Sequence, residues 1–181
     1  MITKIATKVA AFSLKKRSLA YKIISIFCGS IFFLIFIPLL FIWGGKQIEN
    51  YLAINWNQLF SLIIGLIAIF AGLSLMTWAV ITQWLVGEGT PAPVAPPQHL
   101  ITSGPYLLCR NPIKLGAVTY YFGVCTLACS LTVGVLAALL GLIFGSVYHK
   151  SIEEKELEMR FGEAYLEYKK KVPFLWPRIW K

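Results

Sequence analysis

Three long stretches without a charged side chain constrain this chain most strongly. They cover residues 23–43, 50–87 and 115–148. A transmembrane helix needs about 20 consecutive, mainly apolar residues to cross a hydrocarbon core of ~30 Å. Only 14% of the 181 residues are charged, and the mean hydropathy is +0.70, so little length is left for a separate soluble domain. We therefore expect one membrane domain over residues 1–181.

The first two stretches predict one transmembrane helix each, within residues 23–86. The segment before them, residues 1–22, holds six Lys or Arg and no acid, which is typical of the cytoplasmic flank of a first span. The apolar run is too long for a secretory signal, and no small-residue cleavage site follows it, so we expect a signal-anchor helix. Trp56 and Trp84 lie near the two ends of the second stretch, as interfacial aromatic residues do.

The third stretch is too long for one span, because a straight helix over residues 115–148 would measure ~51 Å. Ser130, Leu131 and Thr132 are the best place for a tight turn. A hairpin over residues 113–149 also returns the lysine-rich tail to the basic, cytoplasmic side. We expect an all-α integral membrane protein with four transmembrane helices and with both termini in the cytoplasm.

Residues 151–181 form a different kind of segment, for which we expect a cytoplasmic amphipathic helix. Ser151 and Glu154 have the spacing of a capping box. Several glutamates lie near the start of this helix and lysines occupy residues 169–171 at its end, an arrangement that the helix dipole favours. Pro173 is expected to end the helix. Apolar residues recur every three or four positions: Leu157, Phe161, Ala164, Tyr165, Tyr168 and Val172.

A stiff loop, residues 87–112, separates the second span from the third. Gly87 and Gly89 open it, and four prolines follow by residue 97, which excludes a helix or a central strand there. One interpretation is a rigid connector, and the other is a loop whose glycines bring backbone N–H groups close to a ligand. The glycine pair is no dinucleotide-binding fingerprint, because it follows an apolar helix and no third glycine arrives in register.

Charged residues at the edges of the third stretch are the other candidates for chemistry. Arg110 is either a positive-inside anchor or a side chain that faces a polar cavity. Asn111 is expected to cap the following helix, with Pro112 as its first residue. Glu153 and Glu154 are either ordinary first-turn acids or ligands for amine and ribose hydroxyl groups.

Several classes of function find no support in the residue pattern. The four cysteines and two histidines show no metal-ligand spacing, so we expect no metal. The chain has no Asp, which excludes a Ser-His-Asp triad. The net charge of +9 is gathered beside apolar segments rather than in a basic patch with interleaved aromatic residues, so we expect no nucleic-acid partner.

Taken in order, the motifs over about residues 84–178 resemble those of the isoprenylcysteine carboxyl methyltransferase and phospholipid N-methyltransferase group. The resemblance implies a helical membrane enzyme that uses S-adenosyl-L-methionine and methylates a lipid, lipidated or other hydrophobic acceptor. The matching motifs are Gly87-Glu-Gly-Thr-Pro-Ala-Pro, Gly104-Pro-Tyr, Arg110-Asn-Pro-Ile-Lys-Leu-Gly, the Glu153-Glu154 pair, Phe161-Gly162 and Val172-Pro173.

The resemblance also implies roles for individual residues. Arg110 is the expected catalytic residue, binding an anionic group of the acceptor or of the cofactor. Asn111 and Lys114 replace the His and Tyr of the pattern Arg-His-Pro-x-Tyr-x-Gly, which removes an aromatic side chain and leaves the acceptor open. The expected cofactor-binding residues are Gly87, Gly89, Asn111, Pro112, Glu153 and Glu154.

Two alternatives remain at this point. The C-terminal pattern also resembles the membrane sterol reductases, which use NADPH but are much longer chains. The other alternative is a non-catalytic four-helix membrane protein, such as a small transporter. A transporter would carry polar groups near the membrane midplane, and these stretches have no charged residue there.

Overall fold

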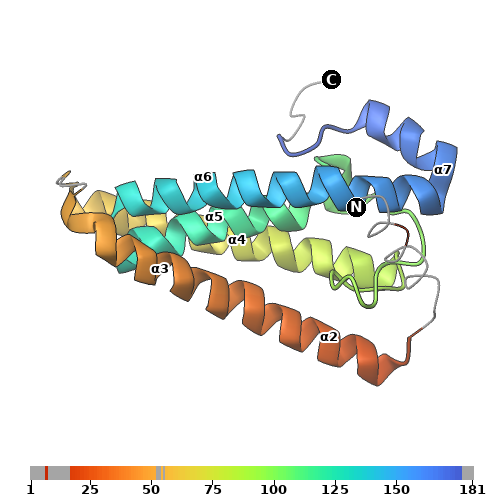
Figure 1. The fold of residues 1–181 in the computed structure, drawn as a ribbon, viewed down its shortest axis with the longest axis horizontal. Helices are drawn as coiled ribbons and strands as arrows, with labels where there is room; N and C mark the ends of the chain where they lie inside the picture. Colours follow the sequence, from red (N-terminus) through yellow and green to blue (C-terminus); the bar gives the residue numbers. More distant parts are fainter. Residues whose placement is uncertain (1–6, 8–16, 52–53, 55, 177–181) are drawn as a thin grey trace.

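The computed structural model describes residues 7, 17–51, 54 and 56–176. These residues form an elongated helical bundle without any strand among them (Figure 1). Within this part of the chain, three continuous helices are long and apolar enough to cross a membrane: Leu19–Ile48, Gln58–Leu85 and Leu131–Lys171. The protein thus has the all-helical architecture of a membrane protein. Most of the basic segment of residues 1–22 lies outside the described residues.

The first helical rod is longer than the charge-free stretch predicts. It joins α2 (Leu19–Ile31), a π-helical turn η1 (Phe32–Phe36) and α3 (Ile37–Ile48), and a short 3₁₀ turn η2 (Glu49–Tyr51) ends it. Ser18 sets its start, because the Ser18 hydroxyl accepts a hydrogen bond from the Tyr21 N–H. The second predicted span is observed as α4 (Gln58–Leu85).

Close backbone contact joins α4 to α5 (Pro112–Ala128), its antiparallel neighbour. Gly65 and Gly72 of α4 face Gly123 and Gly116 of α5, and the two glycines of each helix are seven positions apart. A Cβ atom on Gly72 would lie 2.6 Å from the Gly116 carbonyl oxygen, and one on Gly123 would lie 2.6 Å from the Gly65 carbonyl oxygen. Small residues at a helix interface allow this approach, which is how helices pack in lipid.

The predicted hairpin is observed between α5 and α6 (Leu131–Tyr148). Only Cys129 and Ser130 connect the two helices, and the Ser130 hydroxyl accepts from the Val133 N–H at 3.4 Å, which caps α6. The turn therefore lies at Cys129 and Ser130, at the N-terminal edge of the predicted turn of residues 130–132.

The bundle has two distinct ends. At one end, the Trp56 indole N–H donates to the Thr132 hydroxyl at 2.9 Å, which joins the hairpin turn to the start of α4. At the other end, the Lys22 ammonium donates to the Glu88 carbonyl at 2.5 Å. The start of α2, the proline-rich loop and the C-terminal helix therefore gather at the same end of the molecule (Figure 1).

The predicted capping box at Ser151 is wrong. The chain stays helical from α6 through a π-helical turn, η4 (His149–Glu153), into α7 (Glu154–Lys171), so the N–H groups there bond to α6 and need no cap. Gly162 instead divides the tail, with φ +52° and ψ −129°. Only glycine adopts this conformation readily, and the second half of α7 folds back beyond it (Figure 1).

Folding back completes an apolar core at this end of the bundle. The 3₁₀ turn η3 (Gly104–Leu107) brings loop residues onto α4, and the returning half of α7 packs against both. The buried members of this core come from α4, the loop and the tail: Ala79, Ile101, Tyr106, Tyr165, Tyr168 and Val172.

Candidate functional site

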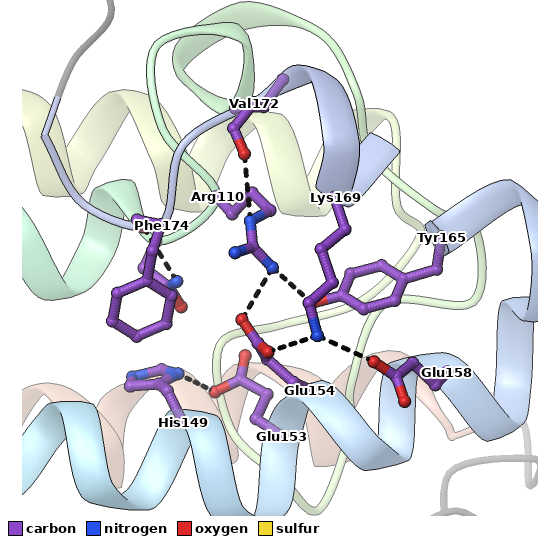
Figure 2. A network of polar contacts seen from close by, with 10 residues as sticks. Arg110, His149, Glu153, Glu154, Glu158, Tyr165, Lys169, Val172 and Phe174 are labelled. Carbon is purple, nitrogen blue, oxygen red and sulfur yellow. Dashed lines mark hydrogen bonds and ion pairs between the residues drawn. The ribbon is translucent and has the colours of Figure 1, made fainter. Parts of the chain in front are cut away.

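A buried polar network surrounds Arg110 at the end of the bundle where α7 folds back (Figure 2). The Arg110 guanidinium donates from Nη1 to Glu154 Oε1 at 2.7 Å and from Nε to the Val172 carbonyl at 3.1 Å. Nη1 also donates to the Tyr165 hydroxyl at 3.2 Å. The Arg110 and Glu154 side chains are only 10% and 12% exposed, so the pair is a desolvated, charge-assisted contact.

The tail segment after α7 holds Arg110 and Asn111 in place. The Arg110 backbone N–H donates to the Pro173 carbonyl at 2.9 Å, and Asn111 Nδ2 donates to the Phe174 carbonyl at 3.1 Å. Asn111 does occupy the N-cap position of α5, and the fully buried Pro112 is the first residue of that helix. The expected side-chain cap is absent, however, because the Asn111 amide bonds the tail instead.

The two adjacent glutamates have different partners. Glu154 Oε2 lies 2.7 Å from the Lys169 ammonium, which also contacts Glu158 at 2.9 Å, and these hydrogen bonds raise the pKa of Lys169. Glu153 instead pairs with His149, one helical turn earlier. Successive positions on a helix point about 100° apart, so the two carboxylates face different surroundings.

Tyr165 closes the network from the returning half of α7. Its side chain is 2% exposed, and burial raises the pKa of the phenol to about 12. The Glu154 charge acts in the same direction, whereas the Arg110 charge opposes it. The phenol is therefore a neutral hydrogen-bonding group at physiological pH.

Gly87 and Gly89 have a packing role in the observed loop. Their N–H groups donate to the Thr82 and Gln83 carbonyls at 3.4 and 3.1 Å. A Cβ atom on Gly89 would collide with Pro97, so only glycine fits between the end of α4 and the proline turn. Because both N–H groups are used within the chain, a ligand would need other backbone groups of this loop.

An ion pair connects the loop to α7. Arg160 Nη1 donates to Glu156 Oε1 at 2.7 Å, with both side chains at most 7% exposed, and Nη2 donates to the Pro97 carbonyl. The glycine loop is thus fixed to the helix that carries Glu154. The structure brings all the predicted site segments to one end of the bundle.

Two buried polar groups lie near the network, Gln83 Oε1 and the Tyr106 hydroxyl. The two side chains lie within reach of one another. Burial raises the pKa of Tyr106 far above its usual value, and the nearby Glu153 charge raises it further, whereas hydrogen bonding to Gln83 opposes this rise. Polar atoms are costly to bury unless they are hydrogen-bonded, so Gln83 and Tyr106 form a small polar patch beside the network.

Sequence reasoning did not identify several members of this site. The helical pattern predicts Lys169 as a helix-end charge and Tyr165 as part of an apolar face, because a straight helix places both far from Glu154. The available signal was Gly162, a glycine in the middle of an otherwise continuous helical pattern. Gln83 gave no signal, since it lies in a charge-free stretch.

The comparison with protein families is decisive here. The family model described as phospholipid methyltransferase matches residues 60–164, more than half of the chain. The chain belongs to the phospholipid methyltransferase family. The match covers nearly all of α4, the glycine loop, the hairpin and the part of α7 that carries Glu154, and it favours the methyltransferase interpretation over the reductase and non-catalytic alternatives.

Two curated proteins share part of this family segment. The protein-S-isoprenylcysteine O-methyltransferases of Mus musculus and Rattus norvegicus are each 38% identical to the chain over 76 residues. The aligned segment makes up 41% of this chain but only 26% of each relative. The chain therefore matches about a quarter of the length of these relatives. No solved structure matches the chain.

Proposed function

We propose that the protein is an S-adenosyl-L-methionine-dependent methyltransferase that acts on a lipid, lipidated or other hydrophobic acceptor at the cytoplasmic membrane face. The observation that carries this proposal is the buried network of Arg110, Glu154 and Lys169, found in a chain of the phospholipid methyltransferase family. Each of these charges sits beside the loop and tail segments that carry the family motifs.

The polar groups at this site fit the chemistry of the cofactor. S-adenosylmethionine presents a sulfonium and an ammonium, which a carboxylate attracts, and ribose hydroxyls, which donate hydrogen bonds to a carboxylate. Glu153 and Glu154 supply these carboxylates. The Arg110 guanidinium would repel the sulfonium, so we assign it to an anionic group of the acceptor. Gln83 Oε1 and the Tyr106 hydroxyl add two buried polar atoms beside these charges. We propose that Gly87, Gly89, Asn111 and Pro112 shape the walls of this site.

The chain's own residues would act by positioning and by excluding water. When bound, the cofactor supplies an electrophilic methyl group. Holding two reactants in line can supply ~7–11 kcal/mol of the barrier, and a dry site strengthens each charge interaction. Arg110 would orient an anionic group, while Glu154 and Lys169 keep the surroundings electrically balanced. Without a ligand, Arg110 and Glu154 neutralise one another.

We also propose that the bundle crosses the membrane four times. The observed α5 has 17 residues, about 26 Å at 1.5 Å per residue, and it packs along α4 and α6. Lys22 and the lysines at 169–171 lie at the same end, which the positive-inside rule assigns to the cytoplasm. In this arrangement the cofactor would reach the site from the cytoplasm, and the acceptor would reach it from the bilayer.

A binding titration with S-adenosylhomocysteine, the cofactor product, tests the proposed site directly. We expect saturable binding to the purified full chain by isothermal calorimetry. Glu154→Gln should weaken it by roughly one to two decades, because a charged hydrogen bond contributes about 1.5–3 kcal/mol. Glu163→Gln, an exposed position on α7, is the matched control. Absence of binding at millimolar concentrations would contradict the proposal.

A further inference from the structure

Two lysines converge on one aromatic ring beside the Arg110 network. Lys114 lies in the first turn of α5 and Lys150 in η4, so they bracket the charge-free stretch of residues 115–148. The hairpin brings them together. The Lys114 Nζ lies 4.8 Å and the Lys150 Nζ 5.2 Å from the centre of the Phe174 ring.

Neither lysine has a carboxylate partner within 4.0 Å among residues 17–51 and 56–176. The nearby acids are already engaged, Glu154 by Arg110 and Lys169, and Glu153 by His149. Lys114 is only 7% exposed, and the Lys114 ammonium donates to the Ser146 hydroxyl at 2.5 Å. Lys150 repels the Lys114 ammonium, and Glu153 attracts it. The buried Lys114 ammonium beside the like charge of Lys150 is costly unless an anion joins them.

The depth of the pair suggests where this anion comes from. Because Lys114 and Lys150 are the first charges on either side of the apolar hairpin, they lie at the boundary of the hydrocarbon region. Lipid headgroups place their phosphates and carboxylates at this level, and basic residues there attract anionic lipids. The Phe174 ring offers an apolar wall for the carbon atoms beside such a group.

We propose that Lys114, Lys150 and Phe174 form a binding site for the anionic headgroup, phosphate or carboxylate, of a membrane amphiphile. The Arg110 Cζ atom lies 5.7 Å from the same ring, so a bound headgroup would lie next to the Arg110–Glu154 pair. That this amphiphile is the methyl acceptor rests on the proposed function. Lys114 stands where the pattern Arg-His-Pro-x-Tyr-x-Gly has its tyrosine. On this account, Lys114 gives the site its preference for an anion.

Lipid binding to the purified full chain, measured without a methyl donor, tests this site. The probes are a tail-labelled phosphatidic acid and oleate, with phosphatidylcholine as the zwitterionic comparison and inorganic phosphate as the free anion. We expect phosphatidic acid and oleate to bind at least about tenfold more tightly than phosphatidylcholine. Equally tight binding of inorganic phosphate would overturn the lipid headgroup as the occupant.

Substitutions of single lysines test whether the lipid binds at Lys114 and Lys150. Lys150→Gln and Lys114→Met should each weaken phosphatidic acid binding about tenfold, whereas Lys150→Arg should keep it within about threefold. Lys155→Gln, an exposed lysine on α7, is the matched control. Lys150 is exposed, so its replacement leaves the fold intact even where Lys114→Met does not. Unchanged affinity in Lys150→Gln would overturn the site. Lipid binding without methyl transfer would overturn the proposed function alone.

Discussion

At the scale of single residues, we propose that the Arg110–Glu154 ion pair determines what the site can bind. Both side chains are nearly buried, and the Glu154 carboxylate lies 2.7 Å from both the Arg110 guanidinium and the Lys169 ammonium. Removing one partner of such a pair leaves an uncompensated charge, which costs about 3–5 kcal/mol where no other group replaces it. Here Lys169 remains beside Glu154, and the Tyr165 hydroxyl and Val172 carbonyl remain beside Arg110, so each single variant should fold.

We predict different effects for the two halves of this pair. Arg110→Ala should abolish methyl transfer while leaving the affinity for S-adenosylhomocysteine within a few-fold, because the arginine is assigned to the acceptor's anionic group. Glu154→Gln should weaken the affinity itself. Calorimetry and a methyl-transfer assay on the same preparations separate the two outcomes, with the unfolding temperature as the control for folding. If Arg110→Ala loses cofactor binding as severely as Glu154→Gln, the assignment of Arg110 to the acceptor is wrong.

The Tyr165 phenol gives the site a signature at alkaline pH. Its pKa is raised from ~10 to about 12, so the unfolded chain loses this proton first. The stabilisation from the neutral phenol is therefore complete below about pH 10 and is lost as the pH rises to about 12. We predict that Tyr165→Phe removes a late tyrosinate transition from the ultraviolet titration of the folded protein. If the titrations of the wild type and Tyr165→Phe differ only by a tyrosine that ionises near its usual pKa of ~10, Tyr165 is not buried.

At the scale of elements, α7 builds the site only because it folds back at Gly162. Among the described residues, no atom beyond the neighbouring backbone lies within 4 Å of a Cβ built on this glycine, so a substitution there tests backbone strain. We predict that Gly162→Ala costs about 1–3 kcal/mol and weakens cofactor binding, because Tyr165 and Lys169 no longer reach Arg110 and Glu154. Chemical unfolding and the calorimetric titration measure the two effects.

The matched control for this variant is Gly44→Ala. Gly44 also has open space around its Cβ position, but it lies in the regular helix α3. Alanine should be neutral or stabilising there. If Gly162→Ala behaves like Gly44→Ala in both measurements, the fold-back does not support the site.

At the scale of the whole molecule, the four-span proposal predicts which positions are accessible from each side. In a variant without the natural cysteines, single cysteines at Ile54 and Thr132 should react with an impermeant reagent from outside. Single cysteines at Val94 and Glu163 should react with the same reagent only after the membrane is permeabilised. Labelling of position 163 from outside would refute four spans and would place Glu154 away from the glycine loop.

The sequence predicts the helices well and the site only in part. The apolar runs dictate α2–α3, α4 and the hairpin, because length and charge leave few alternatives in a membrane. The motifs identify Arg110 and Glu154 as separate candidates. Their direct contact depends on the reversal at Gly162, a tertiary feature that helical periodicity hides. The lysine pair at Phe174 likewise exists only because the hairpin closes.

The most direct test of the central claim is methyl transfer into membranes that contain the purified protein. Vesicles with the full chain are incubated with S-adenosylmethionine that carries a radiolabelled methyl group, and lipids are then extracted separately from protein. The account predicts label in the lipid or lipidated fraction, with little or none for Arg110→Ala and with wild-type incorporation for Glu163→Gln. Equal incorporation by Arg110→Ala and the wild type, or none by the wild type across phospholipid and prenylated acceptors, would contradict it.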